Sequence, residues 1–280
     1  MATATATRVR YEAIKPKIGA RILNTKEELL SGELADEINA LVEERCVLVF
    51  AGVNFTDAEQ VQFTNLLGGN ALEIRGEEVF KVSLDKGVNQ QVAEYLLGSL
   101  YWHIDGTMNP IPIRASILSA KVLAPEGGDT LFANTATAYA DLPEAQKAAI
   151  DGYRVQHSLW NSALYHTPEP TDQQLDDWQS RGEAEVPLVV KHQSGRKSLV
   201  LGNTAAHVIG VDYRESAQLL HKLRNFATSE PYTYRHVWTV GDTVMWDNRT
   251  SLHRATPYDP DCGRMMHRTI LKGGEAWEQD

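Results

Sequence analysis

Apolar residues near the start of the chain recur at the spacing of one helix face. From position 33 onward they occupy the i, i+4, i+7 and i+8 positions, namely Leu34, Ile38, Leu41 and Val42. The continuous apolar run CVLVF, residues 46–50, follows directly. This pattern predicts a helix leading into a buried strand. The first 15 or so residues are small, polar and aperiodic instead, and we expect a frayed start there.

A second helix is predicted by its capping residues. Thr56 precedes two acidic residues and then an apolar residue on each helical turn, as an N-cap residue does. The helix should end near the pair Gly68 and Gly69. Two further helices, over residues 142–150 and 215–227, are expected between strands.

Short β-rich runs separated by turn residues dominate the rest of the chain. They are EVFKVSL (78–84), RASILSAKVL (114–123), DTLFAN (129–134), VPLVVKH (186–192), KSLVLG (197–202), YTYRHVW (232–238) and DTVMWDN (242–248). The run VPLVVKHQSGRKSLVLG predicts a hairpin with its turn at residues 193–196. The pattern predicts an α+β protein with a mainly β core, built as a sandwich or barrel.

The stretch from about 160 to 187 departs from this pattern. It carries LYHTPEP and then the polar, helix-like TDQQLDDWQSRGE between strand-like runs. Such an insertion over the mouth of a β core can act as a lid. A surface excursion with no catalytic part explains the same residues equally well.

Length and composition narrow the class of protein. The chain has 280 residues, 42% of them hydrophobic, which is enough to bury a core in one domain spanning residues 1–280. Its formal net charge of -10 argues against a nucleic-acid surface, because phosphate binding relies on clustered Lys and Arg. The partners should be small molecules, and an anionic substrate would need local arginines.

The two cysteines and the N-terminus indicate where the protein resides. Cys46 and Cys262 form neither a CxxC pair nor a disulfide framework, so both are expected to be free thiols. The N-terminal residues lack the apolar core of a signal peptide, and no run is apolar enough to span a membrane. We therefore expect a soluble, cytoplasmic protein.

The candidate chemistry centres on the tripeptide His103-Ile104-Asp105. Side chains two apart on an extended strand point to the same face, so one short segment could present an imidazole and a carboxylate to one ion. A distant histidine would complete a 2-His-1-carboxylate triad, which leaves coordination positions open for oxygen chemistry. Taken alone an HxD pattern occurs by chance in many chains. The downstream segment 244–271, which contains His253, Arg264 and Arg268, gives it weight.

Several motifs in order then resemble one known family, the taurine and 2,4-dichlorophenoxyacetate dioxygenases that depend on Fe(II) and 2-oxoglutarate. They are CVLVF (46–50), WHID (102–105), GGDTLFAN (127–134), SGRKSLVLG (194–202) and WDNR (246–249) with the following His and two Arg. The resemblance implies a double-stranded β-helix, a jelly-roll or cupin-like fold with flanking helices. It also implies Fe(II) as the metal, with 2-oxoglutarate and O2 as cosubstrates.

The resemblance also assigns roles to residues. His103, Asp105 and His253 would be the metal ligands, and Arg264 would pair with the distal carboxylate of 2-oxoglutarate. Thr130 would supply a second hydrogen bond to the same carboxylate. Trp246 and the polar residues 247–249 match a family signature that we interpret as structural.

Roles in substrate binding are less sharply indicated. Arg268 matches a position that meets the acidic group of the substrate in relatives, although it could instead sit at the barrel rim and pair with an acid near Asp105 or in the lid. His207 lies where some phenoxyalkanoate-type relatives have a pocket histidine, although a loop histidine is more often solvated or structural. Thr107 is a third candidate.

The predicted activity is hydroxylation of a small, anionic organic substrate, a carboxylate or sulfonate, with conversion of 2-oxoglutarate to succinate and CO2. Ser99 stands where the best-known members carry Asn, which argues against taurine and 2,4-dichlorophenoxyacetate themselves. Desaturation or oxidative C–O or C–S cleavage could use the same residues, and a zinc-dependent cupin-type hydrolase or isomerase is a rival. Family members are often dimers or tetramers, so a homo-oligomer is expected.

Overall fold

The computed structural model of the chain describes residues 8–71, 76–89 and 92–278. Its largest sheet has eight strands in the order β1-β2-β3-β14-β6-β16-β4, with β5 also paired to β16. These strands are β1 (Tyr11–Ala13), β2 (Ala20–Ile22), β3 (Val47–Phe50), β4 (Asn70–Ala71), β5 (Phe80–Val82), β6 (Ala115–Val122), β14 (Thr243–Asp247) and β16 (Met265–Leu271). Strands β2 and β3 pair in parallel, and the other pairs in this sheet are antiparallel.

Three smaller sheets complete the β structure. One has the order β13-β7-β15, another β12-β8-β9, and β10 pairs with β11 alone. Their strands are β7 (Thr130–Asn134), β8 (Arg154–Ser158), β9 (Glu183–Pro187), β10 (Val189–Lys191), β11 (Lys197–Leu199), β12 (Ala205–Val208), β13 (Thr233–His236) and β15 (Ser251–Ala255). The described strands thus divide into separate sheets and do not close into one barrel.

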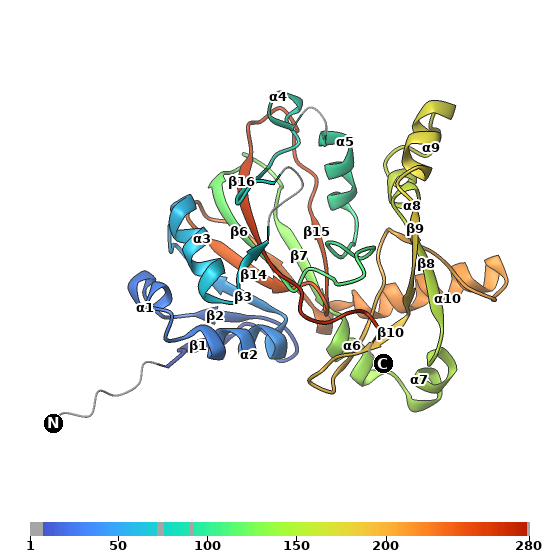
Figure 1. Cartoon of the computed structure of the whole chain (residues 1–280), viewed down its shortest axis with the longest axis horizontal. Coiled ribbons are helices and arrows are strands. Elements are labelled where there is room, and N and C mark those ends of the chain that lie inside the picture. The colour runs from blue at the N-terminus through green and yellow to red at the C-terminus, as the bar shows by residue number, and fades with distance from the viewer. Residues whose placement is uncertain (1–7, 72–75, 90–91, 279–280) are drawn as a thin grey trace.

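Short helices connect the strands and cover the sheets. They are α1 (Lys26–Leu30), α2 (Ala35–Arg45), α3 (Asp57–Leu66), α4 (Lys86–Asn89), α5 (Ala93–Leu96), α6 (Thr135–Asp141), α7 (Glu144–Ile150), α8 (Leu159–Leu164), α9 (Asp172–Gln179) and α10 (Tyr213–Ala227), with 3-10 turns η1 (Leu97–Leu100) and η2 (Glu230–Tyr232). In Figure 1, α1, α2 and α3 lie against one side of the large sheet, and α8, α9 and α10 lie on the opposite side of the molecule. No helix in the described ranges is both long and apolar enough to cross a membrane.

The large sheet is buried on both faces, which explains why β3 is apolar at every position. Leu48 and Phe50 point to a core shared with α2 and α3, whereas Val47 and Val49 point to the opposite face. On that opposite face Phe132 of β7 packs among them, with its ring centroid 5.4 Å from that of Trp246. The three-stranded sheet containing β7 therefore packs face to face with the large sheet.

The predicted helix start at Thr56 is confirmed. Its hydroxyl accepts from the amide of Glu59, and the Glu59 carboxylate accepts from the amide of Thr56, which makes a capping box at the start of α3.

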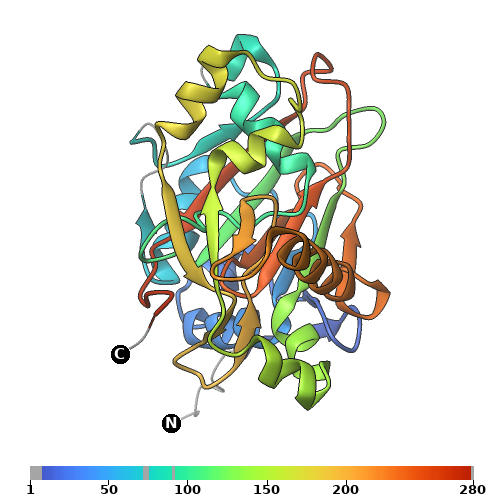
Figure 2. The same cartoon turned by 90° about the vertical axis from the view of Figure 1, so that its right-hand side faces the viewer.

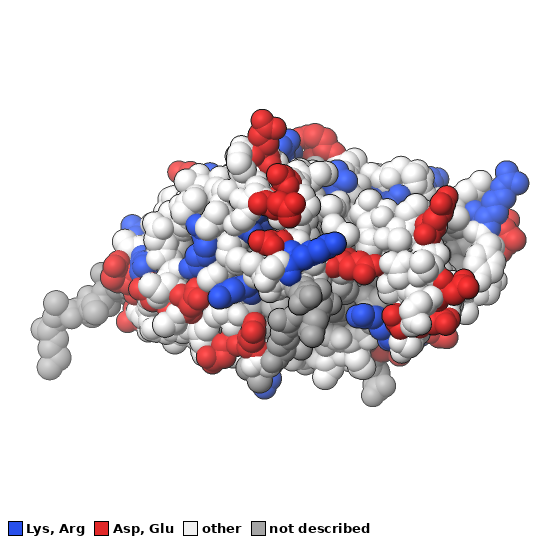
Figure 3. Space-filling model, turned by 90° about the horizontal axis from the view of Figure 1, so that it is seen from above, with Lys and Arg blue, Asp and Glu red and all other residues white. Residues whose placement is uncertain are grey.

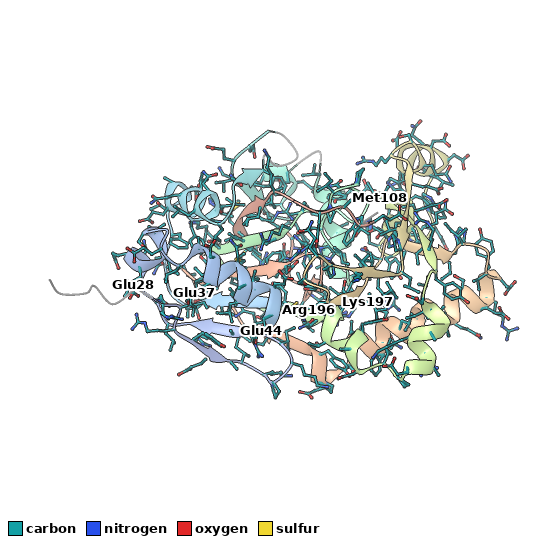
Figure 4. The ribbon with its side chains drawn as sticks, turned by 60° about the horizontal axis from the view of Figure 1, so that its bottom comes forward. Glu28, Glu37, Glu44, Met108, Arg196 and Lys197 are labelled. Carbon is teal, nitrogen blue, oxygen red and sulfur yellow. The ribbon has the colours of Figure 1, made fainter. Side chains whose placement is uncertain are left out.

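The hairpin with its turn at residues 193–196 is also confirmed as β10 and β11. Arg196 of this hairpin donates to the carbonyl of Glu43 near the end of α2, and Figure 4 labels Arg196 beside Glu44.

Two expectations about the strands were wrong. Residues 11–13, expected to be frayed, form β1 and pair with β2, and their exposed side chains explain the missing apolar pattern. The run 186–192 is not one strand, because β9 ends at Pro187 and β10 begins at Val189. Proline has no amide hydrogen to donate, so the chain changes partner there, from β8 to β11.

Candidate functional site

A cavity of about 470 Å³ opens between the two facing sheets. Its wall includes side chains of β6, β7, β15 and β16 from the two sheets, together with residues of the loop 103–109. Leu159 and Ser162 at α8, and residues 181–183 at the start of β9, line it as well. Figure 2 shows α8 and α9 with β8 and β9 on the side of the molecule that faces the viewer. The cavity thus lies where segments far apart in the sequence meet.

Backbone pairing brings His103 and His253 side by side. They form an isolated antiparallel bridge, with N–O distances of 3.0 Å and 2.9 Å in the two directions. Their ring centroids lie 4.1 Å apart. Nδ1 of His103 lies 2.9 Å from the carbonyl of Tyr101, an acceptor that places the ring hydrogen on Nδ1 and leaves the Nε2 lone pair available.

Asp105 joins the two histidines. Its Oδ1 lies 3.7 Å from Nε2 of His103, and its Oδ2 lies 3.5 Å from Nε2 of His253. One donor atom from each of the three residues can be chosen so that all lie within 4.8 Å of one another. Two imidazole nitrogens and one carboxylate oxygen converging on a cavity are the donor set of a non-haem iron site.

The protonation states suit metal binding. Burial, and then the neighbouring His253, lowers the pKa of His103 to about 3, so its imidazole is neutral at pH 7. Burial opposes ionisation of Asp105, but the Arg268 guanidinium holds the pKa of this carboxyl well below its usual value. A neutral imidazole and an ionised carboxylate are the forms that bind a metal ion.

The expected extended strand through residues 103–105 was wrong beyond His103. Only His103 pairs with another strand, and Asp105 begins a turn closed by the bond from the Asn109 amide to the Gly106 carbonyl. Gly106 has a φ of 69°, a left-handed conformation that glycine adopts without strain. Ile104 belongs to the buried apolar core and also contributes to the cavity lining.

Thr130 and Arg264 also line this cavity. Arg264 is 3% exposed, donates from Nη2 to the carbonyl of Gly128 at 2.9 Å, and lies 4.7 Å from the centroid of the Tyr258 ring. Within the described part of the chain, its Nε is buried without a hydrogen-bond partner. Such a group favours an anionic ligand, since a buried cation otherwise lacks the interactions it had in water.

The hydroxyl of Thr130 is oriented by a tryptophan. Nε1 of Trp238 donates to its Oγ1 at 3.0 Å. Indole nitrogen can only donate, so Thr130 acts as the acceptor in this bond and keeps its own hydrogen to donate elsewhere. Thr130 and Arg264 can therefore both present donors to one carboxylate.

The three predicted substrate residues are placed differently. Arg268 lines the cavity, and its Nη1 lies 3.2 Å from Oδ2 of Asp105, so it pairs with the candidate ligand itself. Thr107 lines the cavity and is 2% exposed, and its hydroxyl donates to the carbonyl of Ile104. His207 is not brought to the cavity lining, and its ring lies 4.9 Å from that of Tyr213, so its role stays a prediction.

A comparison with known protein families identifies the family of this chain. Residues 10–270 match the family described as taurine catabolism dioxygenase TauD, TfdA family. This chain belongs to that family. The match covers all three candidate metal ligands.

Several known proteins are similar to this chain over most of their length. An alpha-ketoglutarate-dependent 2,4-dichlorophenoxyacetate dioxygenase of Cupriavidus pinatubonensis is 34% identical over 267 residues, covering 89% of this chain and 92% of the relative. An (S)-phenoxypropionate/alpha-ketoglutarate-dioxygenase of Sphingobium herbicidovorans is 33% identical, covering 86% and 87%. An alkylsulfatase of Acinetobacter baylyi is 31% identical, covering 92% and 83%.

Solved structures show the same architecture. The crystal structure of AAD-2 in complex with Mn(II) and N-oxalylglycine superimposes with a TM-score of 0.82 at 30% identity, covering 96% of this chain and 99% of that one. A taurine dioxygenase from Burkholderia xenovorans superimposes with a TM-score of 0.73 at 28% identity, covering 96% and 90%.

Several residues at this site were missed by the sequence analysis. Ser116 donates to Oδ2 of Asp105 at 2.9 Å, and Trp238 and Tyr258 contact the two candidate cosubstrate residues. Strand alternation could have placed Ser116 on the same face as Leu118, which lines the cavity. Nothing in the spacing links Ser116 to Asp105, since Asp105 lies in a turn.

Proposed function

We propose that His103, Asp105 and His253 hold Fe(II), and that Thr130 and Arg264 hold 2-oxoglutarate beside it. The chain is an Fe(II)- and 2-oxoglutarate-dependent dioxygenase, an oxidoreductase, as its family membership and its relatives indicate. The observation that carries the proposal is the convergence of the three donor side chains with a buried arginine in one cavity.

Iron(II) bound with 2-oxoglutarate and O2 supplies an oxidant that hydroxylates a C–H bond, while 2-oxoglutarate becomes succinate and CO2. The protein holds the metal ion, the cosubstrate and the substrate in position relative to one another. His103 and His253 offer imidazole nitrogens, and the ionised Asp105 offers oxygen. The 2-His-1-carboxylate set leaves positions open for the cosubstrate and for O2.

Arg264 and Thr130 would fix the far end of 2-oxoglutarate. A planar guanidinium matches the geometry of a carboxylate, and the free hydrogen of the Thr130 hydroxyl adds a second kind of donor. The pair of glycines before Thr130 leaves the space that this requires, because a Cβ on Gly128 would lie 2.8 Å from Nε of Arg264. A zinc hydrolase would have no use for this arrangement, which favours the dioxygenase over that rival.

The substrate is proposed to be a small organic anion. Arg268 provides positive charge beside the candidate metal ligands, and Val82, Leu84, Leu96 and Leu118 add apolar lining to the same cavity. Relatives are named for phenoxy carboxylates, alkyl sulfates and sulfate esters, which combine an anionic group with an apolar body. Thr107 is a further candidate contact. Hydroxylation next to an ether or ester oxygen would end in cleavage of that C–O bond.

Residues 160–187 are proposed to be a lid, within a single dioxygenase domain of jelly-roll type. Two contacts join this segment to the opposite rim: Gln174 of α9 donates to Glu94 of α5 at 3.3 Å, and the Tyr165 and Tyr101 rings meet edge to face at 5.2 Å. Residues 181–183 reach the cavity itself. We also propose a cytoplasmic location and a homo-oligomer.

Turnover assays test this function. The protein with Fe(II), O2 and 2-oxoglutarate should form succinate faster when an accepted substrate is present, so phenoxyacetates and alkyl sulfates should be screened with neutral analogues beside them. Only the anionic compounds should stimulate turnover. At saturating Fe(II), Arg268→Ala should weaken substrate binding more than it weakens uncoupled succinate formation, and Arg268→Lys should retain part of the substrate binding. Succinate formation without Fe(II), or equal stimulation by the neutral analogues, would contradict the proposal.

A further inference from the structure

A line of buried side chains reaches Asp105 from the interior of the large sheet. Nε1 of Trp246 donates to Oδ1 of Asn248 at 2.9 Å, and Nδ2 of Asn248 donates to Oγ of Ser116 at 2.9 Å. Oγ of Ser116 donates in turn to Oδ2 of Asp105 at 2.9 Å. Asn248 and Ser116 are 0% exposed and Trp246 is 2% exposed.

The direction of each bond in this line is fixed by chemistry. Indole nitrogen donates only, so the amide oxygen of Asn248 must face Trp246 and its NH2 must face Ser116. Ser116 therefore accepts from Asn248, and its single hydrogen is left for the carboxylate of Asp105. A carboxylate that ligates a metal ion is ionised and can only accept.

The two oxygens of Asp105 consequently have different partners. Oδ2 accepts from Ser116, and two further nitrogens lie near the same atom, Nη1 of Arg268 at 3.2 Å and Nε2 of His253 at 3.5 Å. Oδ1 faces Nε2 of His103 at 3.7 Å. Because Ser116 and Arg268 both hold Oδ2, Oδ1 has more lone-pair capacity left for a metal ion.

We propose that Ser116 and Asn248 are positioning residues, which turn Asp105 so that Oδ1 is the atom presented to the metal ion. The inference rests on the proposed metal site. The frame behind it is rigid, since Ser116 of β6 and Trp246 of β14 are register partners in adjacent strands. The backbone amide of Asn248 also donates to the carbonyl of Arg114 at 2.9 Å, and this bond holds the turn that carries the Asn248 side chain.

The strand β6 offers a matched control. Ser119 is as buried as Ser116, at 2% exposed, and its hydroxyl bonds to that of Thr243 at 2.7 Å. Ser119 lies three positions after Ser116 along β6, so its side chain points to the other face of the strand. Ser116→Ala and Ser119→Ala therefore each delete one buried hydroxyl from the same strand, and only Ser116→Ala breaks the line to Asp105.

The test is the affinity of the purified protein for Mn(II), measured without turnover by electron paramagnetic resonance. Ser116→Ala should weaken Mn(II) binding by about tenfold or more, the range for a partner that orients a metal ligand. Ser116→Thr should restore it, and Ser119→Ala should bind Mn(II) as the wild type does. Thermal unfolding of each variant, measured in parallel, shows that each is folded.

Asn248→Asp gives a second route if Ser116→Ala does not fold. The carboxylate introduced by this substitution could still accept from Trp246 but could not donate to Ser116. The Ser116 hydroxyl would then be drawn away from Asp105, and Mn(II) affinity should fall as for Ser116→Ala.

Three outcomes would overturn the inference: unchanged affinity in Ser116→Ala, unchanged affinity in Asn248→Asp, or equal losses in Ser116→Ala and Ser119→Ala. Asp105→Ala separates the inference from the proposed function. If Asp105→Ala also leaves Mn(II) binding unchanged, the proposed metal site itself is wrong, and not only the positioning role of Ser116 and Asn248.

Discussion

The hydroxyl of Thr130 has one partner in the described part of the protein and one hydrogen to spare. It accepts from Trp238, so the hydrogen can be donated to the distal carboxylate of 2-oxoglutarate beside Arg264. Thr130→Val should raise the apparent KM for 2-oxoglutarate about tenfold or more, because a hydrogen bond to a charged group is worth about 1.5–3 kcal/mol. Steady-state kinetics at saturating substrate measure this change.

The Thr130→Ser variant is the control for that prediction. Serine keeps the hydroxyl and loses only a methyl group, so the KM for 2-oxoglutarate should stay near that of the wild type. A KM that rises equally in both variants would show that Thr130 acts through packing and does not donate to the cosubstrate.

His157 predicts a pH dependence of stability. It is fully buried, and burial lowers its pKa to about 3, against about 6.5 in an unfolded chain. Between these values the unfolded state binds a proton that the folded state does not. The contribution of His157 to the free energy of unfolding is therefore complete above pH ~6.5. It is lost as the pH falls toward ~3, by up to about 1.4 kcal/mol per pH unit.

Urea unfolding at several pH values between ~7 and ~5 measures this effect. The free energy of unfolding should fall less steeply with decreasing pH in His157→Gln than in the wild type. His221→Gln, a replacement on the exposed part of α10, should keep the wild-type slope. Equal slopes in all three proteins would contradict the account.

Among the elements, α3 is held in place by an N-terminal capping box. Thr56→Ala removes one of its two reciprocal bonds and should lower the free energy of unfolding by about 1 kcal/mol. Thr56→Ser should be close to neutral. Chemical denaturation measures both values, and 2-oxoglutarate turnover should be unaffected because α3 lies on the face of the sheet away from the cavity.

The elements also show where sequence reasoning succeeds and where it stops. The start of α3 could be predicted because its capping residues are local in the sequence. The HxD pattern alone missed the turn at Asp105, although the Asp105-Gly106 pair is a local turn signal and Gly106 has a φ of 69°. Ser116 escaped notice because its role follows from contacts with residues distant in the sequence, in β14 and the turn after it.

At the scale of the whole molecule, Arg249 joins three distant parts of the chain. Its guanidinium contacts Asp247 at 2.7 Å, Glu275 at 2.6 Å and Glu43 of α2 at 3.5 Å, and it is 8% exposed. Arg249→Met should lower the free energy of unfolding by about 3–5 kcal/mol, because it leaves buried carboxylates without their cation. Lys197→Met, at an exposed pair with Asp151, should cost no more than about 1 kcal/mol. Chemical denaturation compares the two variants, and equal losses would contradict this reasoning.

Strand patterning predicted the mainly β core, and the ordered motifs of the family resemblance predicted that His103, Asp105 and His253 lie together. The role of the C-terminal segment could not be predicted in either way. Nε1 of Trp277 donates at 2.9 Å to the carbonyl of Thr107, so this segment braces the loop that follows Asp105. The net charge predicted that an anionic substrate would need local arginines, and Arg264 and Arg268 do line the cavity. On the face in Figure 3, basic and acidic side chains are interspersed.

The central claim is that one cavity binds Fe(II) and 2-oxoglutarate together. The most direct test is the visible spectrum of the protein with both, kept free of oxygen. We expect a metal-to-ligand charge-transfer band that is absent in Asp105→Ala and needs much more 2-oxoglutarate to appear in Arg264→Ala. A folded wild-type protein without the band, or an equally strong band in Asp105→Ala, would contradict the claim.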